Sequence, residues 1–269
     1  MSLQEMRKLL TAKNSELAAQ AIKPRTDRSI YPHWEMAINA SATLRFLPDG
    51  NTDNPFFWVE RDMIKLPFAG INGKPEKNPL QILVPCMQMY GEECPVLQEV
   101  RTWLKDPSLE DMARRYWIKR SYFFQGFVRE SPFGESDSPA NPIRQFIIGP
   151  QIHNQVLNML MHRDLLESPC DIERGMDFTI KKTDKNDYAN YDESYWAFKE
   201  SSLNKNEREA VNIYGLKNLG TRLPPKPNSE AVKVICKMFE ASIDGELYDA
   251  DRWSMYFAPN DLALQRNDK

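Results

Sequence analysis

The sequence predicts a mainly β protein with helical insertions, which places it in the α+β class. Short runs of β-branched and aromatic residues between turn residues predict strands, and longer stretches with apolar side chains at helical spacing predict helices. The chain has 269 residues, of which 41% are hydrophobic and 27% are charged, as is typical of a folded globular protein. This length fits one substantial domain with appendages.

The N-terminal residues 1–40 are predicted to form an arm and a connector. Residues 2–20 place apolar side chains between Leu3 and Leu10 on one face of an amphipathic helix. Prolines at positions 24 and 32 then favour an extended chain.

The folded body is assigned to residues 41–222, and a linker, a helix and a C-terminal tail to residues 223–269. Three prolines between residues 221 and 228 predict the linker, and apolar residues at helical spacing follow it. Within the whole chain, strands are expected at 43–47, 55–59, 80–84, 122–128, 143–148 and 177–182. Helical residues are expected at 93–116, where Ser108 can cap a following segment from Glu110 to Tyr116, and at 152–161 and 229–241.

The overall charge excludes global attraction to nucleic acid. Lys and Arg total 35 against 38 Asp and Glu, so any such binding requires local segregation of charge. No apolar run reaches the roughly 20 residues of a membrane span, and the N-terminus lacks the apolar centre of a signal peptide. The protein is therefore expected in the cytosol, and its four scattered cysteines are expected as reduced thiols.

One segment is out of place in an acidic chain. Residues 112–129 contain five Lys or Arg residues, six aromatic residues and no carboxylate. Cationic side chains neutralise phosphates, and exposed rings stack on unpaired bases. A second such stretch at 179–196 combines three lysines with Tyr188, Tyr191, Tyr195 and Trp196. Together they predict a surface for single-stranded nucleic acid, whereas either stretch alone would bind weakly.

A family resemblance accompanies these patterns. Residues 188–194, Tyr-Ala-Asn-Tyr-Asp-Glu-Ser, resemble a stretch of the single-stranded DNA-binding protein of T-even-type tailed bacteriophages. Four further motifs resemble that family in the same order, over roughly residues 42–200. They are Leu44 to Pro48, Cys94 to Val96, Lys119 to Phe123 and Gln145 to Gly149.

The resemblance implies a five-stranded OB-fold barrel with added helices, without enzymatic activity, that coats single-stranded DNA in phage replication, recombination and repair. Its setting would be the cytoplasm of the infected bacterial host. By position, the family's aromatic groove residues correspond to Tyr122, Phe123, Phe146, Tyr188 and Tyr191, and its phosphate-contacting residues to Lys119 and Arg120. Charge and neighbourhood alone add Arg45, Arg115, Tyr116, Arg129, Arg144 and Lys181 as DNA-binding candidates.

The chain departs from this family at its structural zinc site. The family uses one His and three Cys, and a closed tetrahedral site needs all four ligands. Only Cys86 and Cys94 match, Leu97 stands in the place of the third cysteine, and no His occurs between His33 and His153. We therefore expect no cofactor, with apolar packing in place of the metal.

The resemblance also implies partners. The family's N-terminal arm binds a neighbouring subunit, and residues 7–15 are a loose version of its basic motif, so self-association along DNA is expected. The family ends in an acidic tail that binds replication proteins, and here the C-terminal region offers scattered carboxylates for that role.

Two other functions stay open at this point. A Mg²⁺-dependent nuclease would use carboxylates, which cluster at Asp171, Glu173, Asp177, Asp192 and Glu193, but without a metal-motif spacing. A phage structural or adaptor protein would instead use its aromatic residues only to fill a β core.

Overall fold

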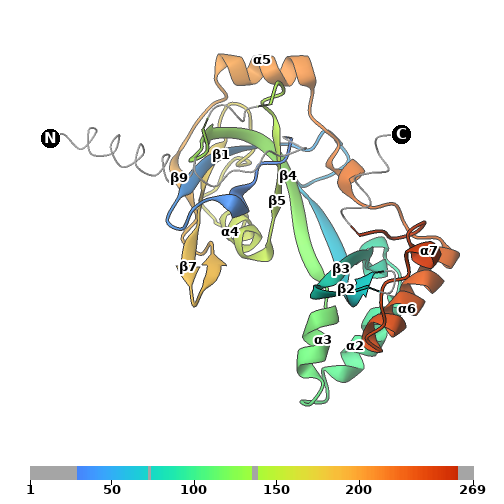
Figure 1. The fold of residues 1–269 in the computed structure, drawn as a ribbon. Coiled ribbons are helices and arrows are strands. Elements are labelled where there is room, and N and C mark those ends of the chain that lie inside the picture. Colours follow the sequence, from blue (N-terminus) through green and yellow to red (C-terminus); the bar gives the residue numbers. More distant parts are fainter. Residues whose placement is uncertain (1–28, 72–73, 135–138, 260–269) are drawn as a thin grey trace. The chain divides into compact units, whose positions relative to one another are not determined.

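The computed structural model describes residues 29–71, 74–134 and 139–259, which form two compact units (Figure 1). The first unit combines the chain up to Val59 with Ser121–Leu223, and the second combines Glu60–Arg120 with the chain from Pro224. The expected helix at 2–20 lies outside the described residues. The body expected at 41–222 is thus shared between both units, because residues 60–120 build a separate apolar core.

The first unit is built on an antiparallel sheet. Neighbouring strands follow the order β5-β4-β1-β6-β9. Among the described residues, the end strands of this order do not pair with each other, so a closed barrel is not found. The strands are β1 (Ser41–Leu47), β4 (Lys119–Glu130, in this unit from Ser121), β5 (Arg144–Ile148), β6 (Met176–Lys181) and β9 (Tyr195–Glu200).

Alternation along these strands builds the core of the first unit. Leu44 and Phe46 on β1 point to the same side as Phe178 and Ile180 on β6, and all four are fully buried. Helix α4 (Pro150–Leu160) packs Ile152 and Val156 into this cluster and begins with proline at its first position, where no hydrogen-bond donor is needed.

The remaining elements of the first unit are η1 (His33–Glu35), β7 (Thr183–Lys185), β8 (Tyr188–Asn190), α5 (Lys205–Tyr214) and η4 (Leu219–Arg222). Strands β7 and β8 form a small hairpin in the chain between β6 and β9, and Figure 1 shows it extending away from the sheet.

The second unit covers a long antiparallel hairpin with helices. The hairpin presents Ile64, Leu66 and Phe68 from alternate positions, all fully buried, against Trp103 and Phe239 of the helices. Its elements are β2 (Val59–Ile71), β3 (Lys74–Pro85), η2 (Met87–Tyr90), α2 (Pro95–Trp103), α3 (Glu110–Tyr116), α6 (Ser229–Ile243) and α7 (Ala250–Trp253).

The α+β class is confirmed, while individual elements differ from expectation. The expected strand at 55–59 is wrong, because side chains form the turns there: the Asn54 amide donates to Asp49 at 2.8 Å and to the Trp58 carbonyl at 3.0 Å. Helix α5, which the sequence prediction missed, begins with a capping box between Asn204 and Glu207. The helical residues expected at 93–116 form α2 and α3, and α3 has the expected bounds, but its N-cap is Leu109 and not Ser108.

Within the described ranges, none of the helices combines the length and the apolar composition needed to cross a bilayer.

Candidate nucleic-acid interface

The β7–β8 hairpin carries the most exposed tyrosine of the first unit. Tyr188 is 77% exposed and pairs across the hairpin with Lys185. Between them, Asn186 and Asp187 adopt left-handed backbone angles (φ 55° and 63°), which Asn and Asp tolerate best among residues with a side chain. The hairpin therefore holds a ring and an ammonium group side by side in solvent.

Helix α4 fixes the base of this hairpin. The Gln151 side-chain carbonyl accepts from the Tyr191 backbone N–H at 3.0 Å, and the Gln155 amide donates to the Tyr191 carbonyl at 2.8 Å. Gln151 also donates to Asn190 and, at 2.6 Å, to Asp192. Because the backbone of Tyr191 is clamped on both sides, the position of the hairpin relative to α4 is set by hydrogen bonds.

His33 connects Tyr191 to a second exposed ring, that of Trp34. His33 contacts Tyr191 edge-to-face at 5.7 Å and Trp34 at 5.3 Å between ring centroids. The Lys182 ammonium donates to the carbonyls of Trp34 and Met36 at 2.7 and 2.8 Å. We name Trp34, Lys182, Lys185, Tyr188 and Tyr191 the hairpin cluster.

Burial sets the protonation of the groups beneath this surface. His33 is buried, and desolvation, followed by the charge of Lys182, lowers its pKa to about 4. Burial also raises the pKa of Tyr191. At neutral pH the His33 imidazole is therefore uncharged and the Tyr191 hydroxyl keeps its proton.

The candidate aromatics of β4 and β5 are interior residues. Tyr122, Phe123 and Phe146 are 6%, 4% and 0% exposed. Tyr122 stacks on His153 of α4 with centroids 3.4 Å apart, so its ring face is already occupied. A ring covered on both faces cannot stack on a base, so the expectation that these three side chains line an open groove is corrected by their burial.

Two candidate arginines belong to a buried ionic network. Arg129 on β4 pairs with Asp177 on β6 at 2.7 Å and with Glu207 on α5 at 2.9 Å. Arg45 on β1 is fully buried and donates to Ser201 at 3.2 Å. Their guanidinium groups hold strands and helix together, which removes them from the set of phosphate contacts.

The other candidates of the first unit are partly engaged. Lys181 pairs with Glu193 at 2.5 Å. Arg144 lies over the ring of Tyr31 at 5.6 Å and donates to the Ile30 carbonyl at 3.3 Å. Burial raises the pKa of Tyr31 to about 12, so its hydroxyl stays neutral beside this cation.

Four candidates lie in the second unit. Tyr116 is buried and its hydroxyl is 2.9 Å from that of Ser242. Arg120 is exposed and pairs with Glu60 and Asp62, each at 2.8 Å. Arg115 and Lys119 are also exposed. Of the predicted aromatic set, the structure thus leaves only Tyr188 largely exposed, with Tyr191 half-buried near the base of the same hairpin.

Sequence reasoning missed Trp34, Lys182 and Lys185 as site residues, although both lysines lie in the basic–aromatic stretch at 179–196. Trp34 lies more than a hundred residues away in the chain, and its neighbour His33 is the contact to Tyr191. In the sequence, Trp34 stands beside His33, after two prolines and before the first expected strand. This position alone predicts no partner for its ring.

The carboxylates considered for metal binding are divided among separate partners. Those on Asp177, Glu173, Glu193 and Asp192 face arginine or lysine, and that on Asp171 accepts from backbone amides. The partners are Arg129 for Asp177, Arg208 for Glu173, Lys181 for Glu193, Lys185 and the Gln151 side chain for Asp192, and the amides of Glu173 and Arg174 for Asp171.

Cys86, Cys94 and Leu97 share the apolar core of the second unit. The neighbouring Cys94 thiol and burial raise the pKa of Cys86. Among the residues that the structure describes, no group of three or more His, Cys, Asp or Glu side chains is arranged to hold a metal ion.

Comparison with known proteins adds no assignment: no protein-family model matches the chain, and neither does any curated protein.

Proposed function

We propose that the chain binds single-stranded DNA without sequence preference, through the hairpin cluster. The observation that carries this proposal is the exposed Tyr188 ring opposite Lys185, on a hairpin that α4 holds in place. A base stacked on such a ring contributes about 1–3 kcal/mol, and a nearby ammonium group neutralises a phosphate.

The strand order supports an OB-type frame for this site. Numbered by sequence, the five strands of the first unit are neighbours in the order third, second, first, fourth, fifth. OB-folds are partly open five-stranded barrels that bind oligonucleotides with the loops after their first and fourth strands. The β7–β8 hairpin is the connection after the fourth strand, so the hairpin cluster lies where such a fold would bind a single strand.

The loop after the first strand offers a further ring. Phe56 is 53% exposed and packs on Trp58 with centroids 4.7 Å apart, and Trp58 contacts His153 of α4 at 5.1 Å. Since α4 also holds Tyr191, both loops are anchored to one helix. We propose Phe56 as a second stacking residue.

Local charge predicts a modest salt dependence. From Lys181 to Glu193 the chain has three lysines and four carboxylates. Lys181 is paired with Glu193 at 2.5 Å, whereas Lys185 is only loosely paired with Asp192 at 3.9 Å and Lys182 donates to backbone carbonyls. We therefore expect about two phosphate contacts from this unit, which gives a slope of log K against log salt of roughly −1.4.

The test is fluorescence anisotropy of a labelled oligothymidylate, with a duplex of equal length as the comparison. We expect the single strand to bind more tightly than the duplex, and Tyr188→Ala to weaken binding about tenfold through the loss of one stacked base. Tyr188→Phe keeps the ring and should retain affinity. Tyr214→Ala, which removes a 47% exposed ring on α5, is the matched control. Equal affinity of the wild-type chain and Tyr188→Ala contradicts the proposed site.

A further inference from the structure

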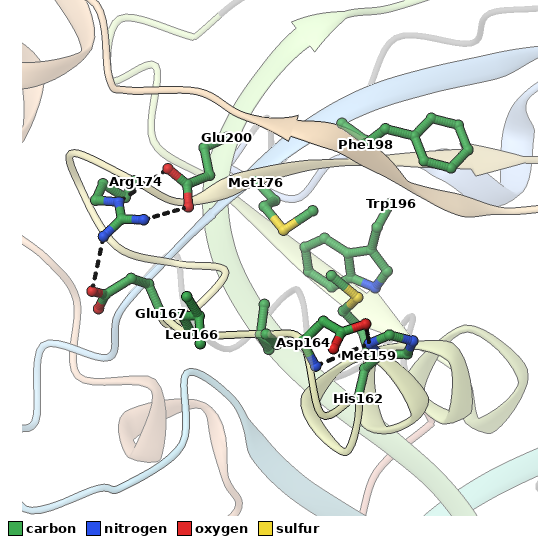
Figure 2. A pocket seen from close by; sticks show the side chains of 12 residues that line it. Met159, His162, Asp164, Leu166, Glu167, Arg174, Met176, Trp196, Phe198 and Glu200 are labelled. Atoms are coloured by element: carbon green, nitrogen blue, oxygen red, sulfur yellow. Dashed lines mark hydrogen bonds and ion pairs between the residues drawn. The ribbon is translucent and has the colours of Figure 1, made fainter.

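A pocket of about 450 Å³ lies beside β9 in the first unit (Figure 2), and none of the hairpin cluster residues lines it. Its apolar lining includes Met159 from the end of α4, Leu166 from the following loop, Met176 from β6 and Trp196 from β9. The indole N–H of Trp196 is fully covered and has no hydrogen-bond acceptor among the described residues. The pocket is thus an apolar hollow with one unsatisfied donor in its wall.

A fully exposed phenylalanine stands at the rim of this pocket. Phe198 is 101% exposed, and Figure 2 shows its ring pointing away from Trp196 and from the rest of the lining. Leu166 at the rim is 82% exposed. Apolar side chains exposed together beside a hollow are typical of protein interfaces.

A β-bulge is the reason Phe198 points outward. Phe178 pairs with Trp196, but Met176, two residues before Phe178, pairs with Glu200, four residues after Trp196. β9 therefore has two residues more than β6 over this interval, and the surplus chain around Phe198 is pushed out of regular pairing. Bulges re-aim side chains in this way at functional edges of sheets.

Charge differs between the pocket and the residue that follows the exposed ring. The pocket lining has three carboxylates and one arginine, so it is net negative. Arg174 bridges Glu167 and Glu200, and Arg163, which is not part of the lining, lies 3.6 Å from Asp164. Lys199 is exposed and has no carboxylate partner among the residues described. The ring with its following cation thus complements an apolar hollow with an acidic rim.

We propose that two copies of this chain associate by placing Phe198 of each copy in the pocket of the other, with Lys199 facing the partner's acidic rim. A projection and a matching hollow side by side on one surface satisfy the requirement of a two-fold interface, in which the same patch serves both copies. The contact is separate from the hairpin cluster and does not depend on DNA binding.

Sedimentation equilibrium of the full chain over a range of concentrations tests this proposal. We expect a reversible dimer, and Phe198→Ala should raise its dissociation constant at least tenfold, since a central buried aromatic anchor dominates such interfaces. Leu166→Lys, which puts a cation at the exposed rim to repel Lys199, should do the same. Tyr214→Ala, at an exposed ring on α5, should leave the constant unchanged.

Mixing the two variants distinguishes this arrangement from other contacts. Phe198→Ala keeps an intact pocket and Leu166→Lys keeps an intact ring, so the mixture regains one of the two contacts. The heterodimer should form at lower concentration than either variant alone. A wild-type chain that stays monomeric at about 200 µM, far above the micromolar range of weak specific contacts, overturns the proposal. So does self-association that Phe198→Ala leaves unchanged, or a mixture that associates no better than its components.

Discussion

Strand β4, which holds most of the basic and aromatic stretch at 112–129, and the β7–β8 hairpin are alike in composition but opposite in exposure. Both combine basic and aromatic residues, yet Tyr122 and Phe123 are buried while Tyr188 is 77% exposed. The difference follows from position in the sheet: β4 has neighbours on both sides in β1 and β5, whereas the hairpin strands pair only with each other among the described residues. Composition therefore indicates that rings and cations occur together, and topology decides which of them reach solvent.

The largest expected effect is a loss of stability when a buried ring is removed. Phe146→Ala removes a fully buried ring that contacts Tyr31 and Phe46 at 6.0 and 5.8 Å. We expect a loss of about 3–5 kcal/mol in the free energy of unfolding, measured by urea denaturation, because the cavity is added to the lost burial. Tyr188→Ala should change this free energy by less than about 0.5 kcal/mol. Similar losses in both variants would contradict the division into a core ring and a surface ring.

The next effect concerns the cations. Arg129→Ala leaves Asp177 and Glu207 without the guanidinium that bridges them, and all three side chains are at least four-fifths buried. Removing one partner of a buried ionic group costs about 3 kcal/mol, so the urea midpoint should fall markedly. Arg115→Ala, at an exposed position on α3, is the matched control and should change little. If Arg129→Ala instead lost DNA affinity while its stability stayed unchanged, Arg129 would be a DNA-binding residue.

The smallest of the three effects probes the base of the hairpin cluster. The folded chain holds the pKa of His33 at about 4, below its ordinary value of 6.5, so the unfolded chain takes up a proton first as pH falls. The stability due to neutral His33 is complete above pH 6.5 and is lost between pH 6.5 and 4, by about 2 kcal/mol at pH 5. In His33→Gln, the urea midpoint should depend less on pH between 6.5 and 4 than it does in the wild-type chain. An unchanged pH profile would show that the imidazole is not buried beside Lys182.

Much of the fold could be predicted from the sequence, because local patterns dictate local structure. The runs at 43–47, 122–128, 143–148 and 177–182 became strands, since their alternating apolar side chains face one core. The division into two units could not be predicted, for two reasons. The sequence pattern predicts strand for only part of the β2–β3 hairpin, and the residues of α6 that pack against this hairpin lie more than 140 residues further along the chain.

The site was predictable only in part, for a related reason. The exposed Tyr188 follows from a polar turn at 184–190, which local composition indicates. Whether Arg45 or Lys182 reaches solvent depends on Asp171, Ser201 and Trp34, none of which is a neighbour in sequence. Pairing between distant charged groups is therefore the information that a single sequence lacks.

The network of Arg129, Asp177 and Glu207 has a consequence for how this chain can evolve. Its members come from β4, β6 and α5, and the two carboxylates balance the two guanidinium groups once Arg45 is included. Replacing one of these charged residues leaves its partner as an unpaired charge in the interior. Replacing all of them together with apolar residues of similar volume is tolerated. Homologues should thus retain or replace these residues as a set. Such correlated substitution would identify a homologue even where overall sequence identity is low.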